Sequence, residues 1–202
     1  MSTDSHIALS HKGRPGAPLV FAFHGTGGDE HQLAGLARQI LPDASLVSPR
    51  GPVSEQGANR FFRRTGEGVY DMTDLALRTE VMAGFIAAHK DRHPGVPLYG
   101  FGYSNGANIL ASVVLRHPGL FDRVALLHPL IPWTPEPVSG LDHTRVLISA
   151  GQQDPICPWP LTDRLITWFV DQGAAVETEI HSGGHELRDG EVQSLGRFLR
   201  AS

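Results

Sequence analysis

The strongest constraint on the fold is a regular alternation of short apolar, β-branched runs with longer segments of helical periodicity. Strands are predicted at 17–23, 44–49, 96–102, 123–128, 145–151 and 174–180, with a weaker strand at 6–10. Helices are predicted at 30–40, from Asp71 to just before Pro94, and at 104–116, 158–172 and 191–199. Successive parallel strands need helical crossovers, so we expect an α/β fold with a mostly parallel sheet and helices on both faces.

Length and composition narrow the class of protein further. The 202 residues contain no repeat or linker, which predicts one domain over residues 1–202. With 17 basic and 21 acidic residues the chain lacks the basic excess of a nucleic-acid-binding protein. The single cysteine, Cys157, excludes a disulfide framework and fits a reducing compartment. The longest apolar run, 17–23, is too short to span a bilayer, and the N-terminus lacks a secretory pattern. We therefore expect a cytoplasmic protein without stable membrane association.

A G-x-S-x-G pattern, Gly102-Tyr103-Ser104-Asn105-Gly106, lies where a predicted strand ends and a predicted helix begins. In this setting a sharp turn exposes the serine hydroxyl at a helix N-terminus, which favours developing negative charge. The alternative is a glycine-rich turn with a capping serine, and the pattern alone does not decide between them.

A serine nucleophile needs a histidine base and an acid that orients it. Asp154 follows the predicted strand 145–151, and His185 follows the strand 174–180, in the order that a serine at position 104 requires. Either residue has an ordinary alternative, since Asp154 is a suitable helix cap and His185 is suited to an exposed loop. The three together, each after a strand, predict a catalytic triad.

The segment His24-Gly25-Thr26-Gly27-Gly28 follows the buried strand 17–23. A loop of small residues there can direct the backbone N–H of Thr26 at an oxyanion, with the N–H of Asn105 as second donor. A phosphate-binding loop is the alternative, but neither of its glycine patterns is completed. His24 is expected to orient this loop through a hydrogen bond.

Four segments, HGTGGDE, GYSNGAN, GQQDPICP and GGHELRDGE, resemble the blocks of the small bacterial carboxylesterase/phospholipase family of α/β-hydrolases. SPRGPVSEQGANRFFRR resembles the form found in its hydroquinone-resistance-associated branch. The resemblance extends from about Val20 to Leu199. It implies an α/β-hydrolase fold without a cap domain and hydrolysis of small carboxylic esters. The chain departs from the family in its short N-terminus, so we expect the first hairpin of the fold to be reduced to one strand. The site residues it implies are Ser104, Asp154 and His185 as the triad and Thr26 and Asn105 as oxyanion donors.

Residues 50–71 lack a clean period, which predicts a long functional loop. Only residues 129–144 separate two later strands, too few for a helical cap, so the site is expected to be open and suited to short acyl chains. Phe61, Phe62 and Trp133 are the candidate walls of a shallow apolar pocket. For Arg60, Arg63 and Arg64 the sequence leaves a solvated turn and a pocket wall equally open.

Three further residues have structural interpretations. His128, which ends the strand 123–128, is expected to be a buried structural histidine rather than part of the pocket rim, and Cys157 a small buried residue. His181 and His185 have a spacing that suits a metal on a helix, but Gly183-Gly184 predicts a loop, so we expect no metal site.

The predicted function is that of a serine carboxylesterase for small, short-chain esters, working through an acyl-enzyme without a cofactor. A thioesterase or lactone hydrolase with the same triad is one alternative. The other is a non-catalytic small-molecule-binding protein on the same fold. The expected partner is a small-molecule ester, and a homodimer is compatible with the sequence.

Overall fold

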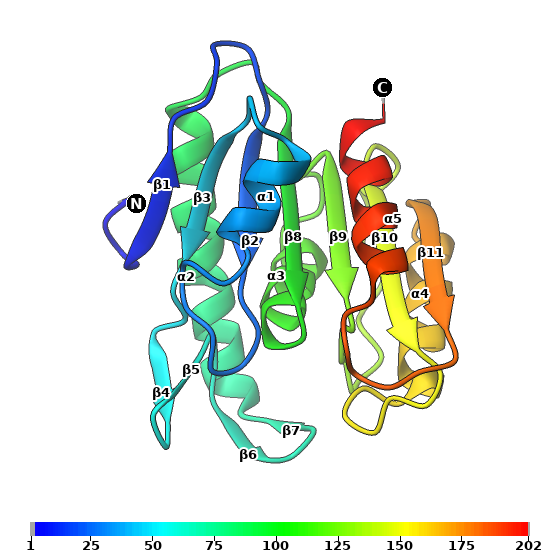
Figure 1. The fold of residues 1–202 in the computed structure, drawn as a ribbon. Helices are drawn as coiled ribbons and strands as arrows, with labels where there is room; N and C mark the ends of the chain where they lie inside the picture. The colour runs from blue at the N-terminus through cyan, green and yellow to red at the C-terminus, as the bar shows by residue number, and fades with distance from the viewer. Residues whose placement is uncertain (1–2, 202) are drawn as a thin grey trace.

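A seven-stranded sheet forms the centre of the computed structural model, which describes residues 3–201 (Figure 1). Its strand order is β1-β3-β2-β8-β9-β10-β11. Every neighbouring pair is parallel except β1 and β3. The strands are β1 (Ala8–His11), β2 (Leu19–Phe23), β3 (Ser45–Pro49), β8 (Leu98–Tyr103), β9 (Arg123–Leu127), β10 (Arg145–Gly151) and β11 (Ala175–His181). The predicted α/β fold with a mostly parallel sheet is confirmed.

Five helices cover the two faces of this sheet. They are α1 (Ala34–Ile40), α2 (Met72–Asp91), α3 (Asn105–Arg116), α4 (Trp159–Asp171) and α5 (Asp189–Arg200). Figure 1 shows α1 and α5 on one face and α2, α3 and α4 on the other. Side chains alternate along β2, so Phe21 packs in the core beneath α2 and α3 while Val20 packs in the core beneath α1 and α5. The central strands β2, β8 and β9 are buried on both faces, which explains why these predicted strands were almost continuous apolar runs.

The segment from 50 to 71 is more regular than the predicted loop. It contains two small antiparallel hairpins, β4 (Val53–Glu55) with β5 (Ala58–Arg60) and β6 (Arg64–Gly66) with β7 (Val69–Tyr70). Gly57 and Gly68 have positive φ angles in the two turns, as short hairpin turns require. The prediction of an irregular loop is therefore wrong here, because strands of two or three residues are too short to show a period of two.

The first helix also differs from its prediction, since α1 begins at Ala34 and not at residue 30. Glu30 and Gln32 are used in turn contacts instead. Glu30 pairs with Arg50 at 2.5 Å, and Gln32 Oε1 accepts a hydrogen bond from the backbone of Gly25 at 2.7 Å. These contacts hold the loop after β2 against the start of α1.

Parallel strands bring distant parts of the chain to one edge of the sheet. The segments that follow β2, β8, β10 and β11 leave the sheet at the same edge, and they carry Thr26, Ser104, Asp154 and His185. Between β9 and β10, residues 128–144 form no helix or strand that would cover this edge. Over residues 3–201, no helix combines the length and the apolar character that crossing a bilayer demands.

Candidate active site

Ser104 occupies a strained turn between β8 and α3. Its backbone has φ 52° and ψ −117°, a conformation that non-glycine residues rarely adopt. The turn depends on its two flanking glycines. A Cβ on Gly102 would lie 2.6 Å from the backbone of Gly106, and a Cβ on Gly106 would lie 2.2 Å from the carbonyl oxygen of Phe23. The G-x-S-x-G pattern therefore reflects a close approach of β8, α3 and β2.

His185 lies between Ser104 and Asp154. Its Nδ1 is 2.7 Å from Asp154 Oδ2, and its Nε2 is 2.9 Å from Ser104 Oγ. Because a carboxylate can only accept, Nδ1 carries the proton and Nε2 is left to accept the serine hydroxyl. Tyr103 donates its hydroxyl to the carbonyl of His185 at 2.6 Å, which fixes the loop that carries the histidine. Burial raises the pKa of Tyr103 to about 12, so this hydroxyl remains a donor.

Asp154 is 5% exposed and its carboxylate is fully hydrogen-bonded. Oδ1 accepts the backbone N–H of Ile156 at 2.8 Å and of Cys157 at 2.9 Å, while Oδ2 accepts from His185 and from His128. Burial acts to raise the pKa of Asp154, but these hydrogen bonds outweigh it and hold the pKa below its usual value. Asp154 is therefore an anion that faces two imidazole rings.

His128 continues this network to the far side of Asp154. It is completely buried, with Nδ1 2.9 Å from Asp154 Oδ2 and Nε2 2.9 Å from Glu191 Oε1. Burial disfavours its charged form, but Glu191 and Asp154 outweigh burial and raise the pKa of His128. The ring therefore lies between two carboxylates, which favour its charged form. Its prediction as a buried histidine holds, whereas its contact with the acid of the site went unrecognised, although its position at a strand end was a usable signal.

Glu191 is the other residue that the sequence analysis missed. It lies on the first turn of α5, 1% exposed, and accepts hydrogen bonds from Ser149 Oγ at 2.6 Å and from the backbone of Arg188 at 2.8 Å. Burial acts to raise the pKa of Glu191, but the contacts with His128 and these donors lower it. Only the fold brings α5 beside the end of β9, so no local pattern could have indicated this contact.

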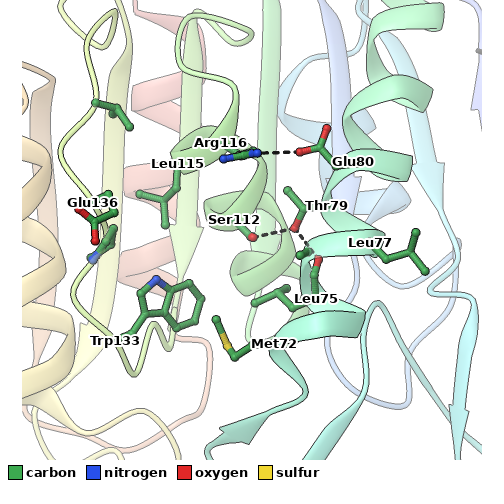
Figure 2. A pocket seen from close by; sticks show the side chains of 13 residues that line it. Met72, Leu75, Leu77, Thr79, Glu80, Ser112, Leu115, Arg116, Trp133 and Glu136 are labelled. Carbon is green, nitrogen blue, oxygen red and sulfur yellow. Dashed lines mark hydrogen bonds and ion pairs between the residues drawn. The ribbon is translucent and has the colours of Figure 1, made fainter.

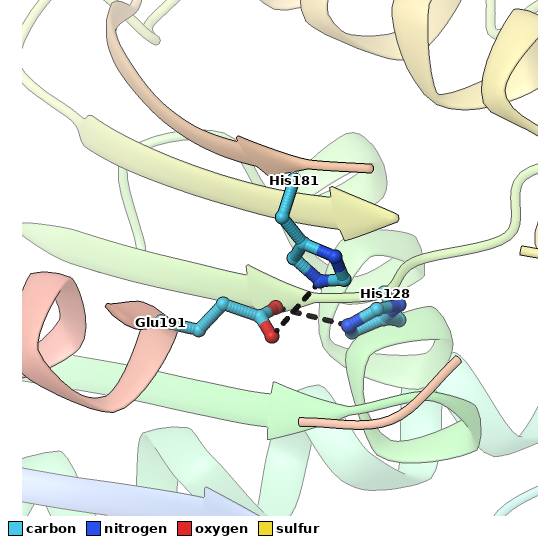
Figure 3. Close-up of side chains that lie close together, drawn as sticks. All are labelled: His128, His181 and Glu191. Carbon is cyan, nitrogen blue, oxygen red and sulfur yellow. Dashed lines mark hydrogen bonds and ion pairs between the residues drawn. The ribbon is translucent and has the colours of Figure 1, made fainter. Parts of the chain in front are cut away.

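His128, His181 and Glu191 are one of two groups among the described residues whose ligand atoms lie close enough together to hold a metal ion (Figure 3), the other being His128, Asp154 and His185. Hydrogen bonds already occupy the second histidine. His181 Nδ1 accepts the backbone N–H of Gly183 at 3.0 Å, which leaves its Nε2 to donate to Glu191 at 3.2 Å. His185, four positions after His181, faces Asp154 instead of this group.

The loop after β2 lies over the N-terminus of α3. Gly51 donates its backbone N–H to His24 Nε2 at 2.8 Å, so the opposite nitrogen carries the proton and donates to the Gly25 carbonyl at 2.7 Å. His24 thus anchors the loop, as its predicted role requires. Thr26 and Asn105 line the same cavity as Ser104. The backbone N–H of Asn105 opens the first turn of α3, where helical N–H groups have no helical acceptor.

The cavity beside Ser104 is small, about 50 Å³. A hydrogen-bonded group forms its back wall, in which Asn108 donates to the Tyr70 hydroxyl at 2.8 Å and Tyr70 donates to the Leu130 carbonyl at 2.8 Å. Arg60 and Arg64 form part of the wall on the side of the hairpins, together with Glu67 and Gly68 of the second hairpin.

The aromatic side chains that were expected to form the wall of the pocket do not line this cavity. Phe61 and Phe62 are 1% and 0% exposed and belong to the hydrophobic core, so their assignment to a pocket wall is wrong. The Phe61 N–H is held by Asn105 Oδ1 at 2.8 Å, which turns this segment of the chain inward. The neighbouring arginines reach the cavity in place of the two rings.

Trp133 lines a different and much larger cavity of about 670 Å³ between α2, α3 and residues 133–138 (Figure 2). Its walls are mostly apolar, with Met72, Leu75 and Leu115 beside the indole. Ser104 is not among the residues that line this groove, so Trp133 does not form part of the pocket beside the serine as expected.

Comparisons with known proteins place these features in context. No family model matches the chain. A Bacillus subtilis protein named “Putative hydrolase MhqD” is 37% identical over 184 residues, which cover 90% of this chain and 92% of that protein. A crystal structure of a protein of unknown function from Agrobacterium tumefaciens is 51% identical with a TM-score of 0.96, covering 100% of this chain and 98% of its own. The structure of a Bacillus cereus carboxylesterase is 34% identical with a TM-score of 0.90, covering 96% and 93% respectively.

Proposed function

The chain belongs to the carboxylesterase family of α/β-hydrolases and is a hydrolase of small-molecule esters, and from this premise we propose that it acts as a serine esterase on short-chain esters. The observation that carries the proposal is the hydrogen-bonded chain from Ser104 Oγ through His185 to Asp154, with distances of 2.9 and 2.7 Å. Nucleophile, base and orienting acid stand within the reach that acyl transfer needs.

The first half of the reaction forms the acyl-enzyme. Ser104 Oγ attacks the ester carbonyl carbon while its proton passes to His185 Nε2. The carbonyl oxygen becomes an oxyanion, and the backbone N–H groups of Thr26 and Asn105 donate hydrogen bonds to it. As the tetrahedral intermediate collapses, the bond to the alcohol oxygen breaks and His185 gives its proton to the leaving alcohol. Asp154 keeps the imidazole in the required tautomer and stabilises the imidazolium.

The second half releases the acid. A water molecule gives a proton to His185 Nε2 and attacks the acyl carbonyl, and the oxyanion again lies against the N–H groups of Thr26 and Asn105. The bond to Ser104 Oγ then breaks, and the proton returns from His185 to the serine. The ester and this water molecule are the two reactants, and the chain's own residues carry out every proton transfer.

The size of the cavity supports short acyl chains. About 50 Å³ holds only a few heavy atoms, so methylene groups beyond these stay in water and add little to binding. Between β9 and β10, residues 128–144 form no helix or strand that would enclose a longer chain.

Replacement of the nucleophile tests the proposal. We expect Ser104→Ala to reduce the hydrolysis of p-nitrophenyl acetate by roughly 10⁵-fold or more, as loss of a catalytic serine does, with the fold retained by circular dichroism. Ser112→Ala, a change in the large groove, is the matched control and should retain the activity. A fluorophosphonate probe should label the protein and Ser112→Ala, but not Ser104→Ala. Undiminished turnover in purified Ser104→Ala, or failure of the native protein to label, would refute the serine mechanism.

A further inference from the structure

Two arginines reach the cavity that contains Ser104, one from each of the hairpins. Arg60 ends β5 and Arg64 begins β6, and both line the cavity. The Arg60 side chain is 95% buried, and its Nη1 donates to Thr26 Oγ1 at 2.9 Å. Arg64 is about one third exposed and faces the open side. The positive charge of Arg60 thus lies directly beside Thr26.

These two guanidinium groups share a single carboxylate among residues 3–201. Arg64 Nε is 3.0 Å from both oxygens of Glu55, and Arg60 Nε is 3.4 Å from one of them. Two cations against one anion leave one positive charge in excess. Glu67 also lines the cavity, but it is exposed in the turn of the second hairpin, where water screens its charge.

Burial is unfavourable for the charged Arg60 side chain, because it shares its carboxylate partner with Arg64. Burial, followed by the nearby charge of Arg64, lowers the pKa of Arg60 from its usual value. Arginine nevertheless stays protonated near neutral pH. An additional anion in the cavity would therefore be stabilised by both side chains.

The adjacent wall offers a further donor. Asn105 Oδ1 accepts the N–H of Phe61, which orients the amide so that Nδ2 is its donor end. This nitrogen is buried and finds no acceptor among the residues that the structure describes. Buried donors without a partner are rare in folded proteins, and one that belongs to a residue of the cavity wall fits a ligand rich in oxygen.

The direction of the strands indicates which part of the ester meets the arginines. His185 follows β11, whereas the hairpins follow β3, on the opposite side of β8 (Figure 1). The leaving alcohol must lie next to His185, which protonates it, and the oxyanion next to Thr26 and Asn105. The acyl group takes the remaining direction, towards the hairpins.

We propose that the substrate is an ester whose short acyl chain ends in a carboxylate, and that Arg60 and Arg64 bind this carboxylate. The substrate class is thus the monoester of a short dicarboxylic acid. The inference rests on the proposed esterase function and deepens it. The carboxylate lies a few atoms from the ester carbonyl, because the cavity of about 50 Å³ is small. Arginine suits this role because its planar guanidinium matches a carboxylate.

Monoethyl succinate and diethyl succinate test the inference. The first carries a carboxylate that is ionised at pH 8, and the second is its neutral counterpart with the same leaving alcohol. We expect the native protein to prefer the monoester in kcat/KM. In Arg64→Gln the ratio of the two kcat/KM values should fall by roughly 10- to 100-fold, the size expected for a hydrogen bond between charged groups. The preference should also weaken as the salt concentration rises.

Arg63→Gln is the matched control, because Arg63 is exposed, precedes Arg64 in the chain and is not among the residues that line the cavity. It should keep the native ratio. Arg60→Lys retains the charge but not the planar fork, and it should lower the ratio as well. Equal kcat/KM values for the two esters in the native protein, or an unchanged ratio in Arg64→Gln, would overturn the inference.

The esterase function is tested separately by the same two esters. If the native protein hydrolyses diethyl succinate and Ser104→Ala does not, the esterase proposal stands whatever the ratio. If the native protein hydrolyses neither ester and fails to react with the fluorophosphonate, both proposals fail together.

Discussion

Two cavities of this molecule, the groove beside Trp133 and the cavity at Ser104, differ in almost every property. The groove between α2 and α3 measures about 670 Å³ and is lined mainly by apolar side chains (Figure 2). The cavity at Ser104 measures about 50 Å³ and is lined by two arginines, a strained serine and two buried asparagines, among others. Large apolar volume is a common criterion for a binding site, and here it selects the groove. Backbone strain, buried charge and convergent hydrogen bonds are instead found at the small cavity, and they identify it as the candidate active site.

The difference follows from how the walls are built. Helix side chains from α2 and α3 form much of the groove, where the hydroxyl groups of Thr79 and Ser112 bond to one another at 2.7 Å. The small cavity lies where strands end, and backbone N–H groups and polar side chains from distant segments meet there. Chemistry on an ester needs these directed groups more than it needs volume.

The small cavity should respond most strongly to a change of the acid behind His185. Asp154→Asn should reduce the kcat for p-nitrophenyl acetate by up to about 10⁴-fold, because an amide allows the wrong imidazole tautomer. Asp142→Asn is the control, since Asp142 forms an exposed pair with His143 at 3.3 Å. It should leave kcat unaltered. A full-rate Asp154→Asn enzyme would show that the acid lies elsewhere.

A substitution in the hydrophobic core behind the small cavity should lower the stability of the protein. Phe62 is fully buried and packs against Tyr70, with 4.7 Å between the centroids of the two rings. Phe62→Ala should lower the free energy of unfolding by about 3–5 kcal/mol, the usual cost of emptying a buried phenylalanine site. Leu77→Ala, an exposed position on the groove, should change it by less than about 0.5 kcal/mol. Urea denaturation measures both. Equal small changes would mean that this part of the core packs loosely.

The buried cation behind the site should make stability depend on pH. The pKa of His128 is raised in the folded protein, so its contribution is complete below about pH 6.5 and is lost as the pH rises through the raised value. His128→Gln removes this contribution and leaves Asp154 and Glu191 without the cation between them. It should destabilise the protein by about 3 kcal/mol near pH 6, with a smaller loss at pH 9.

On the acidic side, the dependence of stability on pH comes from the two carboxylates. The pKa values of Asp154 and Glu191 are lowered, so their contributions are present above about pH 4 and are lost as the pH falls through the lowered values. His143→Gln, at an exposed histidine, is the control and should follow the native Tm at every pH. A gap in Tm between the native protein and His128→Gln that stays constant from pH 6 to pH 9 would contradict the buried cation.

The smallest effect is expected in the groove. Trp133→Ala should change kcat/KM for p-nitrophenyl acetate by no more than about twofold, because the indole lies outside the cavity of Ser104. A set of esters from acetyl to palmitoyl sharpens the comparison, with Arg164→Ala, in a second cavity that Trp133 also lines, as control. If Trp133→Ala selectively lost activity on the long esters, the groove would be part of the substrate site after all.

Most of the fold was predictable because it depends on local patterns. The strands β2, β8, β9, β10 and β11 are each close to their predicted bounds, and Asp71 caps α2 through the N–H of Asp74 at 3.0 Å. The short hairpins between β3 and α2 were not predictable, since two or three residues carry too little periodicity. Their turns, Gln56-Gly57 and Glu67-Gly68, were the only local signal.

The candidate site divides in a similar way. Ser104, Asp154 and His185 stood out because each follows a strand, and in a parallel sheet the strand order alone brings such residues to one edge. The inward turn of Phe61 and Phe62 did not stand out. Hydrophobic residues in an irregular segment fit a pocket wall and a core equally well, and Asn105, 44 positions away from Phe61, decides between them.

By itself, the sequence determined the alternation of strands and helices, the position of the serine turn and the chemical types available at the edge of the sheet. These follow from periodicity and from glycines that no other residue can replace. Only the tertiary structure decided that His128 joins Asp154 to Glu191, that two arginines share Glu55 beside Ser104, and that the tryptophan lies in another cavity. The reason is physical: burial and charge pairing depend on contacts between residues far apart in the chain, and no local pattern encodes such distances.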